Sequence, residues 1–209
     1  MRILLINPPR INEIMGNNPS IIEEERGYNP PLGLLHIASY IQKHTEHEIS
    51  IIDSQVERLD YHSLKLKIES EKPDLVGITA MTMTLVDVIK TARIVKQLDN
   101  TIKVVLGGPH VNLFPNETIK IGSVDYLVLG EGEEVFCDLV EAIKNSSELE
   151  KISGIVFKKN GQIINVGARP HIKNLDDLPF PARHLVPYKK YSSLLFKGKI
   201  VTTIFTSRG

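Results

Sequence analysis

The chain has 209 residues, of which 42% are hydrophobic and 24% charged, and its 25 basic residues balance its 25 acidic residues. This composition is typical of a globular protein, and a formal net charge of zero excludes a dedicated binder of nucleic acid or anionic membranes. The single cysteine, Cys137, excludes an internal disulfide framework and a cysteine-ligated zinc or iron–sulfur centre in these residues. The apolar runs are too short to cross a bilayer and the chain opens without a signal segment, so we predict a cytoplasmic protein.

Short apolar runs alternate with amphipathic segments along the first two thirds of the chain. The runs lack polar–apolar alternation, which indicates strands buried on both faces of a parallel sheet. The expected strands are Arg2–Ile6, Glu48–Ile52, Asp74–Ile78, Lys103–Leu106 and Asp125–Leu129. The expected helices are Leu34–Lys43, Tyr61–Ser70, Thr84–Leu98 and Glu133–Lys144. This pattern predicts an α/β fold with a flavodoxin-like (Rossmann-like) five-stranded parallel sheet in the order 2-1-3-4-5.

The remainder of the chain departs from this alternation. Gly154–Lys158 and Gln162–Val166 flank Asn160-Gly161, a turn signal that predicts a β-hairpin. The proline-rich segment Lys173–Pro187 predicts a linker wrapped over the surface. Lys199–Phe205 predicts a sixth strand. Because that strand has no helix after it to cover it, we expect the chain to be part of a longer protein.

Candidate binding residues follow the ends of the expected strands. Ligands of open parallel sheets bind beyond the carboxyl ends of the strands, and glycine lets a ligand approach the backbone closely. The 26-residue connection from Asn7 to Leu32 is also long enough to indicate a functional loop. The candidates are Asn7, Pro8, Pro9, Gln55, Thr79, Met81, Thr82, Gly107, Gly108, Pro109, His110, Gly130, Glu131 and Gly132.

Several common nucleotide and catalytic sites are excluded. Gly130-Glu131-Gly132 resembles part of a dinucleotide fingerprint, but Val135 stands at the third glycine position and nearby glutamates would repel a pyrophosphate. A phosphoacceptor domain needs acidic residues where this chain has Asn7 and Thr79. The chain contains no G-x-x-x-x-G-K-[ST] loop and no G-x-S-x-G elbow. His110 is left open as a ligand, a base or a loop residue.

The motifs, taken in order, resemble one family. NPP, PPLGLLHIASY, GITAMTMT, GGPH, GEGE, LDDLPFPAR and TSRG together resemble the N-terminal half of cobalamin-dependent radical S-adenosylmethionine enzymes. The resemblance runs over the whole chain and stops just before the family's C-x-x-x-C-x-x-C cluster motif. It implies a cobalamin (B12)-binding domain at residues 1–148, a β-hairpin and linker at 149–198, and the first strand of a radical barrel at 199–209.

The resemblance also implies roles for the candidate residues. Gly107 and Gly108 match the glycine pair beside which the nucleotide tail of cobalamin runs. The stretch that borders this tail is matched by Thr79, Met81 and Thr82, and the rim after the fifth strand by Gly130, Glu131 and Gly132. In the whole protein, the family would add a [4Fe–4S] cluster and S-adenosylmethionine for methyl transfer or a radical rearrangement or cyclisation. Tetrapyrrole cyclase is a common name for such proteins. The chain alone is expected to bind cobalamin without turnover.

One departure from the wider cobalamin pattern concerns the metal. Classical cobalamin enzymes carry D-x-H-x-x-G after the second strand, and its histidine coordinates cobalt. Here Asp53 is followed by Gln55 at the histidine position and by Arg58 at the glycine position. We therefore expect base-off cobalamin, no metal-ligating or catalytic residue in this chain, and a lower face covered by the loop Arg10–Pro30.

Two other functions remain open. The chain could be a flavodoxin-like scaffold or small-molecule-binding module that no longer binds cobalamin, or a small-molecule transferase with His110 as its base. The first alternative predicts no affinity for cobalamin, and the second predicts catalysis that is lost in His110→Ala. The oligomeric state stays open, because an unpaired last strand would allow pairing between copies.

Overall fold

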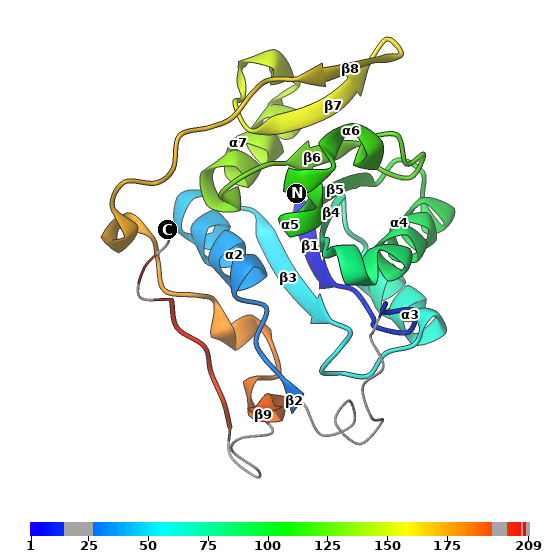
Figure 1. Cartoon of the computed structure of the whole chain (residues 1–209), viewed down its shortest axis with the longest axis vertical. Coiled ribbons are helices and arrows are strands. Elements are labelled where there is room, and N and C mark those ends of the chain that lie inside the picture. The colour runs from blue at the N-terminus through cyan, green and yellow to red at the C-terminus, as the bar shows by residue number, and fades with distance from the viewer. Residues whose placement is uncertain (15–26, 194–199, 206, 208–209) are drawn as a thin grey trace.

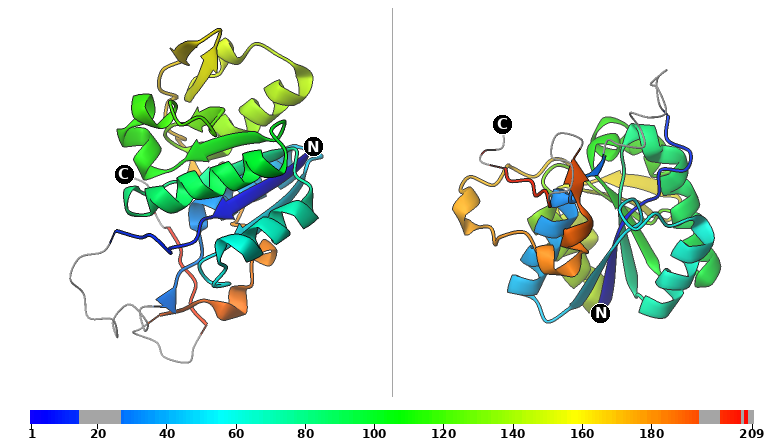
Figure 2. Two further views of the ribbon diagram at one scale, coloured as in Figure 1. Left: turned by 90° about the vertical axis from the view of Figure 1, so that its right-hand side faces the viewer. Right: turned by 90° about the horizontal axis from the view of Figure 1, so that it is seen from below.

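The computed structural model describes residues 1–14, 27–193, 200–205 and 207. Its centre is a seven-stranded sheet in the order β3-β1-β4-β5-β6-β7-β8, with helices on both faces (Figures 1 and 2). The strands are β1 (Arg2–Asn7), β3 (Glu48–Asp53), β4 (Leu75–Thr79), β5 (Lys103–Gly107), β6 (Tyr126–Val128), β7 (Ile155–Lys159) and β8 (Gln162–Asn165). A second, two-stranded sheet pairs β2 (Gly27–Tyr28) with β9 (Ser192–Ser193).

Helices connect the successive strands of the main sheet from β1 to β7. They are α2 (Leu32–His44), α3 (Tyr61–Glu71), α4 (Leu85–Leu98), α5 (Pro109–Leu113), α6 (Pro115–Thr118) and α7 (Gly132–Asn145). Short 3-10 turns occur at Thr82–Thr84, Leu149–Lys151, Leu175–Asp177, Arg183–Leu185 and Tyr188–Lys190. Within the described part of the chain, none of the helices has the length and apolar character needed to cross a membrane.

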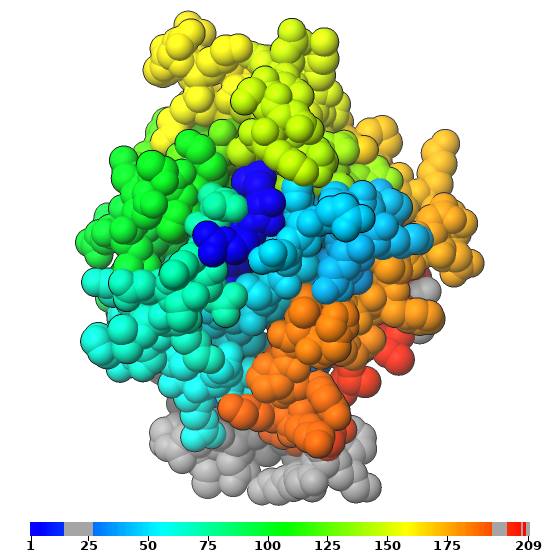
Figure 3. Space-filling view, turned by 180° about the vertical axis from the view of Figure 1, so that it is seen from behind, coloured from blue at the N-terminus to red at the C-terminus, as the bar shows by residue number. Residues whose placement is uncertain are grey.

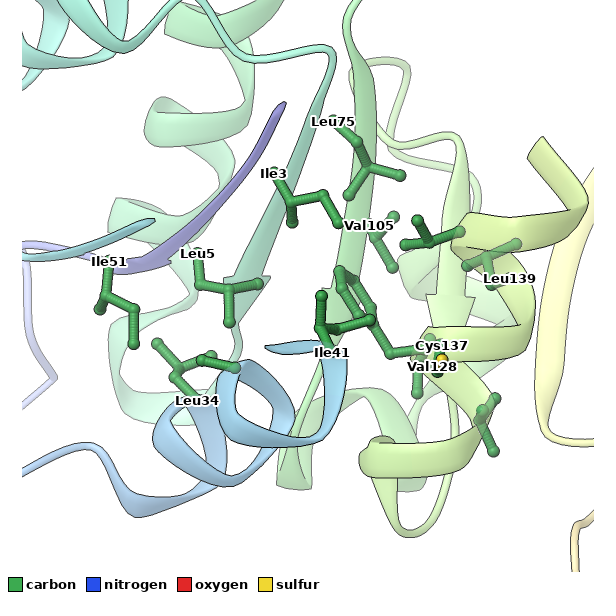
Figure 4. Packing of buried hydrophobic residues seen from close by; sticks show 14 of the residues in the cluster. Ile3, Leu5, Leu34, Ile41, Ile51, Leu75, Val105, Val128, Cys137 and Leu139 are labelled. Carbon is green, nitrogen blue, oxygen red and sulfur yellow. The ribbon is translucent and has the colours of Figure 1, made fainter. Parts of the chain in front are cut away.

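Two hydrophobic cores, one on each face of the sheet, explain why the strands lack alternation. In β1, Ile3 and Leu5 belong to the core under α2 and α7, whereas Leu4 and Ile6 belong to the core under α3 and α4. Figure 4 shows the first of these cores, with Leu34 of α2 and Leu139 of α7 packed against the sheet. Each strand residue therefore meets apolar atoms whichever way it points, as expected for a parallel sheet covered on both sides.

The parallel register brings the carboxyl ends of four strands to one edge. Asn7 of β1 is paired with Asp53 of β3, and Thr79 of β4 is paired with Gly107 of β5. β1 lies between β3 and β4. The connection after β1 leads to β3 on one side of it, and the connection after β3 leads to β4 on the other side. Such a reversal opens a crevice at the strand ends, which positions the site described below.

The predicted hairpin forms, but it belongs to the main sheet. Asn160 and Gly161 have φ angles of 51° and 79°, the left-handed values that a two-residue hairpin turn requires. β7 pairs antiparallel with β6 and covers the edge that β6 would otherwise leave open. The prediction of a five-stranded sheet is therefore wrong in the number of strands, and the predicted order does not describe the whole sheet because it leaves out β7 and β8. Five parallel strands are extended by a two-stranded antiparallel hairpin.

The segment after the hairpin packs along α2 (Figure 3). The backbone N–H of Ala182 donates to the Leu35 carbonyl at 3.1 Å, and Lys43 Nζ donates to the Asp177 carbonyl at 3.1 Å. The predicted strand at Lys199–Phe205 is wrong for residues 200–205, which form no regular secondary structure. Their hydrogen bonds go to the linker instead, since Arg183 donates to Thr202 and Thr203. Thr206, Arg208 and Gly209 of the TSRG motif lie outside the described residues.

His110 has a packing role in α5. Its side chain is buried, its Nδ1 lies 3.1 Å from Thr82 Oγ1, and its ring centroid lies 5.2 Å from that of Phe114. These contacts join α5 to the 3-10 turn that follows β4. Burial lowers the pKa of His110, and the nearby Glu117 opposes this shift only in part.

This burial predicts a pH-dependent stability. The folded chain binds a proton at His110 less readily than the unfolded chain, in which a histidine has its ordinary pKa of about 6.5. The free energy of unfolding should therefore fall as the pH drops through about 6.5 toward 5, and His110→Gln should make this fall shallower. Urea denaturation at a series of pH values measures both effects.

The matched control is His62→Gln, because His62 is exposed on α3. We expect His110→Gln to change the pH dependence more than this control does. Equal pH dependence in the two variants would contradict the assignment of a packing role to His110.

Candidate functional site

A cavity of about 510 Å³ opens beyond the carboxyl ends of β1, β4, β5 and β6. Its wall includes Asn7, Thr79, Gly107 and Gly130, which end or follow these strands. Residues of α2 and of the start of α7 form the opposite wall. The volume lies within the range of about 300–1,000 Å³ that is usual for small-molecule and cofactor sites.

The cavity extends from the strand ends into the layer between the sheet and α2. Its lining includes Leu5, Gly77 and Val105 from the interior of strands, with Phe136 from α7. A Cβ atom at Gly77 would lie 2.7 Å from Leu5 Cδ2 and 3.3 Å from Phe136 Cε2. A side chain at this position would therefore collide with Leu5 and Phe136, and glycine permits their close approach to the strand. The site is thus a mouth at the strand ends with an apolar inner part beside the sheet; this inner part, lined by Leu5, Gly77, Val105 and Phe136, is called the slot below.

Gly108 forms the turn between β5 and α5. Its φ of +107° is a conformation that side chains with a Cβ rarely adopt, and an added Cβ would lie 3.0 Å from the Ala80 carbonyl oxygen. The same carbonyl accepts a hydrogen bond from the His110 N–H at 3.1 Å, and the Ala80 N–H donates to Gly107 at 2.7 Å. These bonds bring the loop after β4 and the loop after β5 together at the rim.

The first turn of α2 forms one side of the mouth. Pro31, Leu32 and Gly33 line the cavity, and His36 and Ile37 continue the same wall one turn later. This first turn carries no acidic side chain, whereas the first turn of α7 carries Glu133 and Glu134. The positive end of the α2 dipole is therefore better suited to a negatively charged ligand group than that of α7.

A network of polar side chains holds the floor of the cavity at β1 and β3. The buried Asp53 accepts a hydrogen bond on Oδ1 from Asn7 Nδ2 at 2.8 Å and from the Gln55 N–H at 3.2 Å. Gln55 Nε2 donates in turn to Asn7 Oδ1 at 3.1 Å and to the Pro8 carbonyl at 3.0 Å. Burial raises the pKa of Asp53, and the hydrogen bonds that it accepts reduce this shift. Asn7 and Gln55 both line the cavity.

A second buried carboxylate fixes the beginning of the long connection after β1. Asp87 of α4 accepts hydrogen bonds from the Asn12 N–H at 3.0 Å and from the Tyr61 hydroxyl. Burial, together with the bond to Asp87, raises the pKa of Tyr61. The Ile14 N–H donates to the Met83 carbonyl at 2.8 Å. These contacts hold the segment that follows Arg10, a cavity-lining residue. The lower-face cover expected from Arg10–Pro30 falls largely on residues 15–26, outside the described residues.

The cavity brings together many of the residues predicted from the strand ends. Those in its lining are Asn7, Gln55, Thr79, Met81, Gly107, Gly108, Gly130, Glu131 and Gly132. Pro8, Pro9, Thr82, Pro109 and His110 lie outside the lining. Two of these contact each other, because Thr82 Oγ1 and His110 Nδ1 lie 3.1 Å apart.

Sequence reasoning missed the wall opposite the sheet. The expectation that ligands bind beyond the carboxyl ends of the strands does not predict contacts with a covering helix or with strand interiors, so α2 and these strand residues were missed. Gly77 was detectable, since a glycine inside a buried apolar strand indicates a close approach. Lining residues outside the predicted set include Leu5, Arg10, Asn29, Pro31, Leu32, Gly33, His36, Ile37, Gly77, Met83, Val105, Glu133, Phe136 and Phe205.

The site offers no set of protein ligands for a bare metal ion. Among the described residues, no group of three or more His, Cys, Asp or Glu side chains is arranged to hold a metal. The cavity combines an apolar slot with a rim of backbone and amide groups. Such a lining is typical of small-molecule and cofactor sites.

Known proteins are similar to this chain in sequence. Over 213 residues, the chain is 37% identical to PH0819 of Pyrococcus horikoshii, an uncharacterized methyltransferase; the match covers 100% of this chain and 43% of the relative. It is 29% identical over 196 residues to the anaerobic magnesium-protoporphyrin IX monomethyl ester cyclase of Rubrivivax gelatinosus, covering 91% of this chain and 34% of that protein. The chain thus spans less than half the length of these relatives.

A solved structure and a family model agree with this similarity. The cobalamin-dependent S-adenosylmethionine radical enzyme OxsB, solved with aqua-cobalamin bound, superposes with a TM-score of 0.71 at 16% identity, over 87% of this chain and 24% of that one. This likeness establishes the fold. The family model described as B12 binding domain matches residues 20–140, which contain most of the cavity wall. The resemblance inferred from the motifs is confirmed, and the chain belongs to the B12 binding domain family.

Proposed function

We propose that the chain binds cobalamin in this cavity as the cofactor-binding part of a radical S-adenosylmethionine enzyme. The observation that carries the proposal is the placement and lining of the cavity, which opens at the strand ends and continues past Gly77 between the sheet and α2. Cobalamin has two parts that would use these two regions, a broad corrin ring and a long nucleotide tail. Membership of the B12 binding domain family supports the same ligand.

The lining suggests which residues would hold each part of the cofactor. Asn7, Thr79 and Met81 stand at the mouth, where the corrin would lie, and Gly77 and Val105 line the slot, where the tail would lie. The tail contains a phosphodiester, and the first turn of α2 provides the helix end without acidic residues that suits such a group. The apolar slot would exclude water from the nucleotide base.

We propose further that cobalamin is bound base-off and without a histidine from this chain beneath the cobalt. Gln55 occupies the position at which a ligating histidine would stand, and its amide nitrogen already donates to Asn7 and Pro8. An amide oxygen is a weak ligand compared with imidazole. A base held in the slot would also be kept away from the metal.

The activity of the whole protein is a separate proposal. The relatives named above include a methyltransferase and a cyclase, and the chain spans less than half of each. We propose that the remainder contributes a [4Fe–4S] cluster and S-adenosylmethionine, and that the reaction is a methyl transfer or a radical rearrangement or cyclisation. When bound, cobalamin would supply a cobalt centre able to carry a methyl group or to change oxidation state. This chain would bind and orient it.

Titration with hydroxocobalamin tests the binding proposal. We expect the chain to retain the corrin after desalting, with an absorption spectrum typical of the base-off form. A retained corrin with a base-on or histidine-ligated spectrum would keep the function and overturn the assignment of Gln55. A chain that retains no corrin would contradict cobalamin binding and favour the scaffold alternative.

Gly107→Val tests the location of the site. Gly107 lines the cavity, and a Cβ at this position meets its nearest neighbour, the Val128 carbonyl oxygen, at an ordinary 3.6 Å. The larger side chain should therefore fill part of the slot without breaking the sheet. We expect cobalamin affinity to fall by at least about tenfold, which corresponds to about 1.4 kcal/mol.

The control for this substitution is Gly122→Val. A Cβ at Gly122 meets nothing within 4 Å, and the residue is exposed and absent from the lining. We expect its cobalamin affinity to match the wild type, and urea denaturation should show both variants folded. Full affinity in a folded Gly107→Val chain would place the cofactor elsewhere.

A further inference from the structure

Tyr191 is far in sequence from β1 and β3, yet its side chain reaches the polar network at the floor of the cavity. Its side chain is 1% exposed, and its hydroxyl donates a hydrogen bond to Asp53 Oδ2 at 2.8 Å across 138 positions of sequence. Tyr191 follows the proline-rich linker and directly precedes β9, which pairs with β2 just before α2. The same short segment thus contacts the floor of the cavity and the entry to its α2 wall.

The Asp53 carboxylate links Tyr191 to the cavity-lining residues Asn7 and Gln55. Its other oxygen, Oδ1, accepts from Asn7 Nδ2, and Asn7 Oδ1 accepts from Gln55 Nε2. The second hydrogen of the Gln55 amide goes to the Pro8 carbonyl. Because both amide hydrogens are used, the polar atom that Gln55 can offer to a ligand is the acceptor Oε1.

A buried carboxylate keeps its orientation only while its oxygens are satisfied. Asp53 is 1% exposed, and in the described part of the chain Tyr191 is the side-chain donor to Oδ2. Without this donor, the carboxylate would rotate toward other donors or draw in water, since an unsatisfied buried acceptor is costly. Rotation would disturb Asn7, and through Asn7 it would disturb Gln55.

We propose that Tyr191 is a positioning residue of the cobalamin site, which fixes the Gln55 carboxamide through Asp53 and Asn7 so that Oε1 faces the ligand. The inference rests on the proposed function, since it needs cobalamin in the cavity. The amide side chains of the corrin ring are hydrogen-bond donors of the kind that Oε1 would accept. A tyrosine after the linker therefore contributes to a site whose floor is built from β1 and β3, far from it in the sequence.

The test is a double-mutant cycle in hydroxocobalamin affinity. Tyr191→Phe keeps the aromatic ring and removes the hydroxyl, and Gln55→Ala removes the carboxamide. We expect Tyr191→Phe to weaken binding about fivefold to tenfold in the wild-type background, as for the loss of one buried hydrogen bond. In the Gln55→Ala background the same substitution should have no further effect, because its action passes through Gln55. Tyr188→Phe, in the same segment and half-exposed, is the matched control and should bind as the wild type does.

Two outcomes would overturn the proposal. An equal loss of affinity in both backgrounds would indicate a general structural role, and no loss from Tyr191→Phe would indicate no role in binding. A wild-type chain that does not bind cobalamin would defeat the proposed function instead. In that case the Gln55 side-chain amide signals, measured by NMR without ligand, decide the positioning role. They should shift in Tyr191→Phe and stay unchanged in Tyr188→Phe, and unchanged signals in both variants would overturn it.

Discussion

The site depends on the hydrogen bonds that the buried carboxylate of Asp53 accepts. It stands at the carboxyl end of β3, paired with Asn7 of β1, and its hydrogen-bond partners come from the end of β1, the loop after β3 and the segment before β9. Burying such a group is unfavourable unless donors surround it, so each partner is held in place by the same requirement. The floor of the cavity is thus a polar network inside an otherwise apolar fold.

The parts of the fold predicted from sequence are those governed by local chemistry. The buried strands are recognisable in the sequence as apolar runs without alternation. They lack alternation because α2 and α7 cover one face of the sheet and α3 and α4 cover the other. The hairpin follows from Asn160-Gly161, whose residues tolerate positive φ. Asn7, Thr79 and Gly107 were found because parallel strands end at one edge.

The parts that were missed depend on contacts between distant segments. No local pattern shows that β7 would pair with β6 and so raise the strand count to seven. The α2 wall follows from how this helix crosses the sheet, and Tyr191 acquires its proposed role only when the segment after the linker folds back onto Asp53. His110 is buried and contacts Thr82, which no local pattern shows, and its role as a binding residue stays a prediction.

The proposed function requires the slot beside β4 and β5 to hold the nucleotide tail of cobalamin. A crystal structure of the chain with hydroxocobalamin, with the cobalt located by its anomalous scattering, would show where the tail lies. We expect cobalt beyond the carboxyl ends of β1 and β4, and the nucleotide base in the slot between Gly77 and α2, away from the metal. A base coordinated to cobalt above an empty slot would contradict it.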